Sequence, residues 1–122
     1  MSNDVLVLAY SGCGTCKKAQ KWLEEHGVEY HVRPIVETPP TVSELQHWIP
    51  LSGVSVRKWL NTSGQSYRAL GKARVDAASD TELMSWLAAD GKLIKRPVLV
   101  TRGTVLVGFQ PDAYAQALAP RR

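Results

Sequence analysis

Apolar and polar positions in the first third of the chain predict a strand, a helix and a second strand. Residues 5–9 form a continuous apolar run, which is typical of a buried strand. Over residues 14–26 the apolar side chains recur at spacings of three and four, which predicts a helix with one buried face and Gly27 as its stop. Residues 28–32 then predict a second strand. A crossover helix of about a dozen residues favours parallel pairing of these strands in a right-handed unit.

The middle of the chain follows a different pattern and predicts several short helices. Residues 41–44, Thr-Val-Ser-Glu, form a capping box that starts a helix. We expect this helix to end at Pro50 and two shorter helical segments to follow within residues 56–70. The section over about residues 41–75 carries too little apolar surface to fold alone. We therefore interpret it as a helical insertion in a single domain that spans residues 1–122.

The last third predicts a helix, a hairpin and a final helix. A second capping box, Ser-Asp-Thr-Glu at residues 79–82, leads into a helical apolar pattern that stops at Asp90-Gly91. The apolar runs 98–100 and 105–107 flank a short glycine-containing turn, which predicts two antiparallel strands. Pro111 suits the first position of a helix and opens the last one.

Assembled in order, these elements predict an α/β fold of the thioredoxin-like class. It has a mixed four-stranded sheet flanked by helices, with the helical insertion in the middle. In that fold a proline at the start of the third strand commonly has a cis peptide bond and faces a cysteine site. Pro97 is the proline placed to do so in this chain.

Two cysteines lie where the first strand turns into the first helix. Cys13 falls near the helix N-cap and Cys16 three residues later, so we expect both sulfurs on the same side of the first turn. Free backbone N–H groups and the helix dipole favour a thiolate at Cys13, and Lys17 and Lys18 add positive charge. A second thiol nearby can resolve an oxidised or substrate-bound first one as a disulfide. The pattern predicts a redox site.

Other interpretations of the cysteine pair are two small buried hydrophobic residues or half of a zinc site. A structural zinc ion needs four ligands, and the three histidines, His26, His31 and His47, are not spaced as a second half-site. We therefore expect no metal. The four tryptophans fall on apolar helical faces and are expected in the core: Trp22, Trp48, Trp59 and Trp86.

The composition indicates an ordinary globular domain but does not indicate a particular reaction. The chain has 122 residues, of which 44% are hydrophobic and 21% charged, as in ordinary globular domains. Its net charge of +4 comes from scattered residues, with Arg121-Arg122 paired, so we expect no direct nucleic-acid binding. No apolar run approaches the roughly 20 residues that span a bilayer, and residues 1–4 lack a basic leader region. We expect a cytoplasmic location without membrane contact, where cysteines stay reduced and a permanent disulfide is disfavoured.

Several motifs together resemble the arsenate reductase (ArsC) family, including its Spx and YffB-like branches, along nearly the whole chain. The matching stretches are Cys13-Gly14-Thr15, residues 37–41, residues 54–57, Leu60-Asn61-Thr62, Lys95-Arg96-Pro97 and Val107-Gly108-Phe109. The resemblance implies that Cys13 is the nucleophile and that Arg57 and Arg96 hold an oxyanion. Guanidinium groups suit that role because they present fixed bidentate donors.

Each of these assignments has a simpler alternative. Arg57 also reads as a solvated helix residue and Arg96 as a charged residue at a strand edge. Asn61 and Thr62 could contact a thiol cosubstrate or merely form a turn.

The chain also departs from the arsenate reductases at three places. Gln110 stands just before Pro111, where a third arginine is expected, and Ala9 and Tyr10 occupy the stretch in which some members carry a histidine. Cys16 points instead to Spx, which has a Cys-x-x-Cys switch and binds the C-terminal domain of the RNA polymerase α subunit.

Two functional hypotheses follow from the resemblance. The first is a cytoplasmic thiol-dependent reductase with no bound cofactor, in which Cys13 attacks a disulfide or an oxyanion such as arsenate. Cys16, or glutathione or a thioredoxin- or glutaredoxin-type donor, resolves the intermediate. The second is a redox-switched regulator of the Spx type that binds RNA polymerase. A family member with a vestigial site is the third interpretation.

Overall fold

The computed structural model describes residues 5–118, so residues 1–4 and the Arg121-Arg122 pair lie outside the described part. The first half of the sheet is the predicted strand-helix-strand unit: β1 (Leu6–Ala9), α1 (Gly14–Glu25) and β2 (His31–Pro34). β1 and β2 pair in parallel, with Val7 opposite Val32. The sheet is completed by the hairpin β3 (Val98–Thr101) and β4 (Thr104–Val107).

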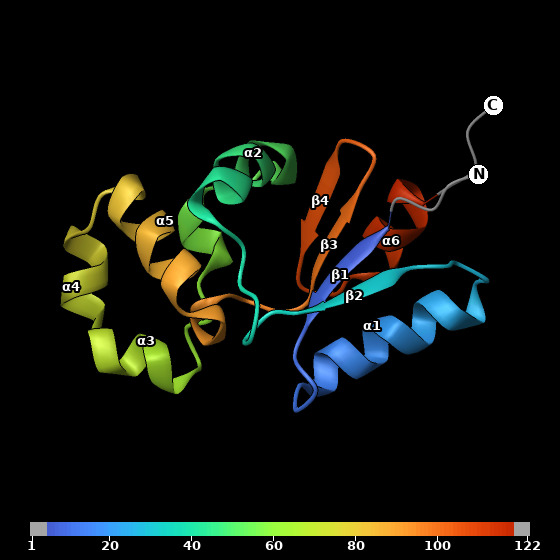
Figure 1. Ribbon diagram of the computed structural model, residues 1–122, viewed down its shortest axis with the longest axis horizontal. Coiled ribbons are helices and arrows are strands. Elements are labelled where there is room, and N and C mark those ends of the chain that lie inside the picture. The colour runs from blue at the N-terminus through green and yellow to red at the C-terminus, as the bar shows by residue number, and fades with distance from the viewer. Residues whose placement is uncertain (1–4, 119–122) are drawn as a thin grey trace.

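The four strands lie in the order β2-β1-β3-β4, and β3 runs antiparallel to both β1 and β4. Figure 1 shows α1 and α6 (Pro111–Ala117) on one side of this sheet and the helices α2 to α5 on the other. The predicted thioredoxin-like mixed sheet is therefore confirmed, and so are the hairpin and the final helix, which has Pro111 in its first turn.

β1 supplies side chains to a hydrophobic core on each face of the sheet. Val7 and Ala9 pack with buried residues of α1 and with Tyr114 of α6. Leu8 points the other way and packs among the buried residues of the helical half. This alternation explains why the apolar run is continuous, because both faces of the strand are covered.

β2 begins at His31 rather than at Val28, where the sequence pattern predicted it. Gly27 takes the left-handed conformation with φ +68°, and the N–H of Val28 donates to the carbonyl of Leu23 at 2.9 Å. These residues close the end of α1 and pack Val28 onto it, so the chain becomes extended only afterwards.

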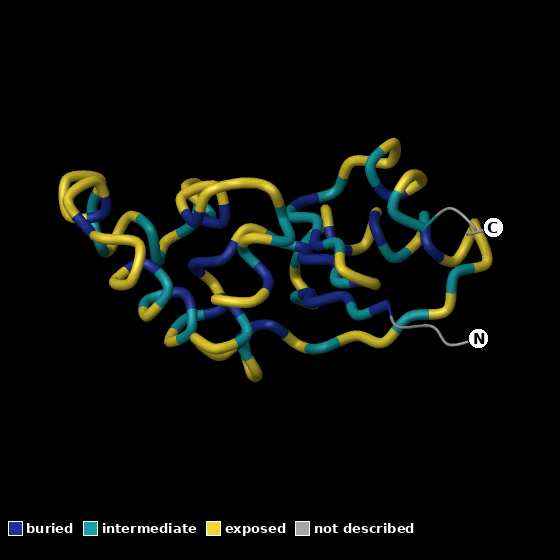
Figure 2. The backbone as a smooth tube through the Cα atoms, turned by 90° about the horizontal axis from the view of Figure 1, so that it is seen from above, coloured by how far each residue is buried: buried dark blue, intermediate teal, exposed yellow. Residues whose placement is uncertain are grey.

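The helical half contains four α-helices and two short 3₁₀ helices. They are α2 (Val42–Ser52), η1 (Val56–Trp59), α3 (Gln65–Leu70), α4 (Lys72–Ala77), α5 (Asp80–Ala89) and η2 (Gly91–Leu93). Figure 2 shows buried segments running from these helices into the sheet half. Trp59 is fully buried and Trp48 nearly so, in the same cluster as Leu8 and Val98. The helical half and one face of the sheet thus share one core.

Both predicted capping boxes are present, and one predicted helix end is wrong. Thr41 and Glu44 exchange hydrogen bonds at the start of α2, as do Ser79 and Glu82 at the start of α5. However, α2 continues through Pro50 to Ser52 and stops at Gly53, which has φ +72°. Proline lacks the N–H that would bond to the previous turn, and one missing bond near a helix end is tolerated. After α2, the helix α4 ends at Ala77 and α5 follows from Asp80.

Two contacts attach the sheet to the helical half. The guanidinium of Arg33 on β2 makes a bidentate pair with Glu44 on α2, at 2.8 and 2.9 Å, and donates to the carbonyls of Thr38 and Pro39. These bonds from Arg33, above all, hold the pKa of Glu44 below its usual value. At the start of η2, the backbone of Gly91 approaches Ile35 so closely that a Cβ would overlap the Ile35 carbonyl.

Within residues 5–118, no helix is long and apolar enough to cross a membrane.

Candidate active site at the helix N-terminus

Cys13 is the N-cap residue of α1, as predicted. Its backbone is extended, and its sulfur accepts a hydrogen bond from the N–H of Cys16 at 3.2 Å. The N–H of Cys13 itself donates to the carbonyl of Tyr10 at 3.0 Å, which fixes the turn between β1 and α1. The sulfur thus occupies the position where a serine or aspartate oxygen usually caps a helix. Cys13 is half-buried and keeps a path to solvent.

Cys16 lies in a different environment although it is one helical turn away. Its side chain is 1% exposed and belongs to the core under α1, together with Ala19 and Leu23. Burial, and secondly a hydrogen bond with Cys13, raises the pKa of Cys16 from 9.0 to about 12; the charge of Arg96 acts weakly in the opposite direction. At neutral pH Cys16 is therefore a thiol, and Cys13 is the cysteine that a substrate can reach.

Arg96 precedes a cis peptide bond to Pro97, at the start of the strand beside β1. Its guanidinium carbon lies 5.2 Å from the centre of the Tyr10 ring. Its Nε is buried without a hydrogen-bond partner, and one terminal nitrogen donates to the carbonyl of Lys92 at 3.4 Å. No carboxylate within the described part of the chain pairs with this arginine. Its charge is therefore available to a ligand.

Cys13 and Arg96 line the same cavity, which has a volume of about 370 Å³. Its wall also contains an ammonium group, two amides, a hydroxyl and an aromatic ring. The lining residues are Cys13, Thr15, Asn61, Lys95, Arg96, Val107, Gly108, Phe109 and Gln110. None of them carries a carboxylate, so an anion or an electron-rich sulfur can enter without repulsion. Within residues 5–118, no three His, Cys, Asp or Glu side chains gather as metal ligands.

Arg57 is not brought to this cavity. It lies on η1, and its guanidinium donates to the carbonyls of Val75 and Ala78 at 3.0 and 2.6 Å. Both carbonyls lie at the C-terminal end of α4, where the Val75 carbonyl also accepts from the N–H of Ala78 at 3.1 Å. Of the two arginines that the resemblance assigned to an oxyanion, the structure thus places Arg96 beside Cys13 and Arg57 elsewhere.

Sequence reasoning did not assign Lys95, Thr15 or Gln110 to the site. Gln110 stands where the resemblance led us to expect an arginine. Its side chain lines the cavity, as the arginine was expected to, but it carries no positive charge. Asn61 reaches the cavity because its segment pairs with the segment before β3. The N–H of Asn61 donates to the carbonyl of Leu93 at 2.8 Å, and Leu60 forms an isolated bridge with Ile94. The local pattern of apolar and polar residues does not predict that pairing.

The fold and the site define a thioredoxin-like protein with a cysteine at a helix N-terminus, in a cavity shared with the arginine that precedes a cis-proline. The model of the ArsC family matches residues 8–117, and the chain belongs to that family. It is 44% identical over 108 residues to the uncharacterized protein YusI of Bacillus subtilis, covering 88% of this chain and 92% of YusI. An ArsC family related protein from Bacteroides fragilis has the same fold, with a TM-score of 0.90 and 46% identity over 93% of this chain and 97% of that one.

Relatives with more specific names are less similar. The arsenate reductase from Vibrio cholerae superposes with a TM-score of 0.86 at 26% identity, covering 97% of this chain and 100% of that one. The global transcriptional regulator Spx of Streptococcus pneumoniae is 29% identical over 109 residues, which are 89% of this chain and 80% of Spx. The proteins that this chain resembles thus include an arsenate reductase and a transcriptional regulator.

Proposed function

We propose that this chain is a cytoplasmic thiol-dependent reductase that acts on a disulfide or on an oxyanion such as arsenate. The observation that carries the proposal is the cavity in which Cys13 lies with Arg96 and Lys95 and without a carboxylate. An accessible cysteine at a helix N-cap beside fixed cations is the arrangement that activates a thiol as a nucleophile. The arsenate reductase from Vibrio cholerae, which shares the fold, supports the oxyanion as one substrate class.

The first chemical step is a nucleophilic attack by the thiolate of Cys13. With a disulfide, a bond forms between the Cys13 sulfur and the nearer substrate sulfur, the substrate disulfide bond breaks, and the far sulfur leaves with the electron pair. With arsenate, a bond forms between the Cys13 sulfur and arsenic, and one arsenic–oxygen bond breaks as that oxygen leaves as water. A second thiol then attacks the Cys13 sulfur, the sulfur–arsenic bond breaks with its electron pair on arsenic, and arsenic(V) becomes arsenic(III) as the two sulfurs form a disulfide. In both cases Arg96 stabilises the negative charge that develops beside Cys13.

The second step needs a thiol that attacks the intermediate on Cys13. Cys16 is close enough in sequence and space, but its burial and its pKa of about 12 keep it protonated at neutral pH. An external thiol can enter through the cavity. We therefore assign resolution to glutathione or to a dithiol protein of the thioredoxin or glutaredoxin type, with Cys16 as the internal alternative.

Turnover assays test this assignment. The purified protein is incubated with glutathione or thioredoxin, each regenerated by its NADPH-dependent reductase, and with a small disulfide or arsenate. We expect NADPH consumption that Cys13→Ser abolishes and that Cys16→Ser retains with an external donor. Absence of turnover with every pair of donor and substrate would overturn the proposal.

The second candidate function is a redox-switched regulator, favoured by the Cys13 and Cys16 spacing and by the Spx relative. In this role the chain binds the C-terminal domain of the RNA polymerase α subunit in one redox state. A pull-down with that domain, on reduced and on oxidised protein, separates the two functions. If neither form is retained, the regulator is rejected.

A further inference from the structure

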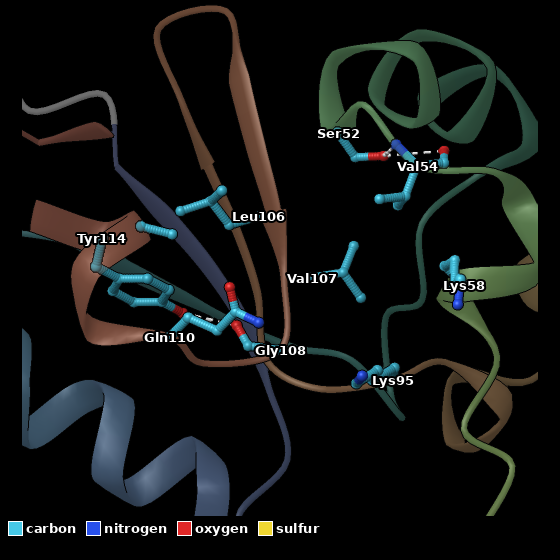
Figure 3. Close-up of a pocket in the computed structure, with 10 residues that line it drawn as sticks. Ser52, Val54, Lys58, Lys95, Leu106, Val107, Gly108, Gln110 and Tyr114 are labelled. Carbon is cyan, nitrogen blue, oxygen red and sulfur yellow. Dashed lines mark hydrogen bonds between the residues drawn. The ribbon is translucent and has the colours of Figure 1, made fainter. Parts of the chain in front are cut away.

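A second cavity of about 240 Å³ adjoins the cavity of Cys13. It lies between β4 and α6 on one side and α2 and η1 on the other, as Figure 3 shows. Lys95, Val107, Gly108 and Gln110 line both cavities, so the two adjoin along these residues. In Figure 3, Val107 projects into the space between the two walls. The second cavity is therefore the nearest described space into which a ligand bound at Cys13 would extend past Val107.

The second cavity carries positive charge and no negative charge. Lys58 on η1 and Lys95 before β3 both line it, and no aspartate or glutamate does. Within the part of the chain that the structure describes, neither ammonium group has a hydrogen-bond or ion-pair partner. With Arg96, three cations thus follow one another along the two cavities.

Both hydroxyl groups of this wall are already engaged. The Ser52 hydroxyl donates to the carbonyl of Ile49 at 2.6 Å and accepts from the indole N–H of Trp59 at 3.2 Å. The Tyr114 hydroxyl donates to the carbonyl of Gly108 at 3.4 Å. Much of the remaining surface is apolar and includes Val54, one of the few exposed large hydrophobic residues of the described chain. The free polar groups are therefore the two ammonium groups and the Gln110 amide, and only the ammonium groups are charged.

We propose that the second cavity binds the leaving half of a disulfide substrate and selects a half that carries a carboxylate. This inference rests on the proposed reductase function and names its substrate class. The half attached to the attacked sulfur stays on Cys13 as a mixed disulfide. The other half leaves from the second cavity as a thiolate, with the electron pair of the broken bond, and Lys95 lies beside its path. Lys58 lines the second cavity and not the first, so it reports on this subsite alone.

Two symmetric aromatic disulfides of different charge test the proposal. The dianion 5,5′-dithiobis(2-nitrobenzoate) and the neutral 4,4′-dithiodipyridine both release a product that is followed by its absorbance when Cys13 attacks. We measure the ratio of their rate constants in the wild type, Lys58→Gln, Lys58→Glu and the control Lys21→Gln. Lys21 lies on α1, carries the same charge and lines neither cavity.

We expect Lys58→Gln to lower the anionic-to-neutral ratio about threefold, as the loss of one charge some 7 Å from a carboxylate in a wet cleft would do, and Lys58→Glu to lower it further. The ratio should also fall with added salt. Lys21→Gln should keep the wild-type ratio. Glutathione disulfide and its carboxyl ethyl ester repeat the comparison with a peptide ligand.

A ratio that is the same in Lys58→Gln, Lys58→Glu and Lys21→Gln would overturn the subsite while the reductase proposal stood. Failure of the wild type to react through Cys13 with either reagent would overturn both. The circular dichroism and melting temperature of each variant establish that it is folded.

Discussion

Cys13 and Cys16 are one helical turn apart, yet the fold gives them opposite properties. Cys13 caps the helix and faces a cavity, whereas Cys16 is packed beneath the helix. The spacing of the two cysteines is visible in the sequence. Their unequal burial cannot be seen in the sequence, because it depends on how closely α1 packs against Leu99 and Tyr114 from distant parts of the chain.

The buried thiol of Cys16 makes stability depend on alkaline pH. A group whose pKa rises from 9.0 to about 12 on folding favours the folded state fully below pH 9, and this contribution is lost as the pH rises towards 12. We expect the difference in unfolding free energy between wild type and Cys16→Ala to narrow over that interval. Urea unfolding at several pH values, with exclusion of oxygen, measures it. Parallel curves for the two proteins would contradict the assignment.

Tyr10 has a role at the site that the sequence did not indicate. Its ring lies under the guanidinium of Arg96, and a Cβ on Gly12 would come within 2.9 Å of the same ring. The ring is thus confined between the turn that carries Cys13 and the arginine. Because Arg96 has no carboxylate partner among the described residues, the ring and the Lys92 carbonyl are the contacts that position its charge.

We expect Tyr10→Leu to slow the reaction of Cys13 with the anionic disulfide reagent about two- to fivefold relative to the neutral one. That factor corresponds to a cation–π contact of about 0.5–1 kcal/mol. Tyr10→Phe keeps the ring and serves as the matched control. Equal ratios in Tyr10→Leu and Tyr10→Phe would show that the ring does not position the arginine.

Among the elements, those specified by neighbouring residues were predicted well. The apolar run of β1, the two capping boxes and the glycine turn of the hairpin all act within a few residues, and the structure has each of them. α4 was not predicted, because its six residues carry a single buried side chain, Val75. A helix so short is stabilised by contacts that it makes with the rest of the molecule rather than by its own pattern.

Arg57, which the resemblance assigned to the site, also has contacts that the local sequence could not predict. Its partners lie 18 and 21 residues further along the chain, so no local pattern could reveal them. We expect Arg57→Lys to destabilise the fold by about 1–3 kcal/mol, because a lysine cannot serve both carbonyls with the same geometry. The rate of Cys13 alkylation by iodoacetamide should stay unchanged.

Urea unfolding and alkylation kinetics measure both effects, with Arg68→Lys as the control for an exposed arginine that makes one backbone bond. If Arg57→Lys kept full stability and slowed the anionic disulfide reagent as much as Arg96→Lys, an oxyanion-binding role for Arg57 would be restored.

At the scale of the whole molecule, the site is assembled from both halves. Cys13, Phe109 and Gln110 come from the sheet half, and Asn61 and Lys58 come from the helical half. The parallel pairing of β1 with β2 and the antiparallel hairpin of β3 and β4 followed from the sequence, because each of these two connections is short. The convergence of Lys95, Gln110 and Asn61 could not be predicted from the sequence. It depends on the pairing of segments more than thirty residues apart, such as Leu60 with Ile94.

The close approach of Gly91 to Ile35 gives a test of how tightly the molecule is packed. We expect Gly91→Ala to lower the unfolding free energy by about 1–3 kcal/mol or more, since a methyl group there meets backbone that has little room to move. Gly14→Ala, at a helical position with no atom within 4 Å of the added carbon, should be neutral or slightly stabilising. Thermal melts of the two variants check this, and equal melting temperatures would contradict it.

The backbone bonds between the residues after η1 and those before β3 have a consequence for exchange with solvent. The N–H groups of Asn61 and Lys95 each donate from one of these segments to the other, to the carbonyls of Leu93 and Trp59 respectively, both at 2.8 Å. Both residues line the Cys13 cavity, so the same bonds that hold its walls also protect two amide hydrogens. In deuterium oxide we expect these two amides to have the same protection factor, the ratio of intrinsic to observed exchange rate, and a larger one than the amides of α3. Unequal protection factors would mean that the two sides of the cavity open separately. A common protection factor would make these amides a direct measure of how often the site opens.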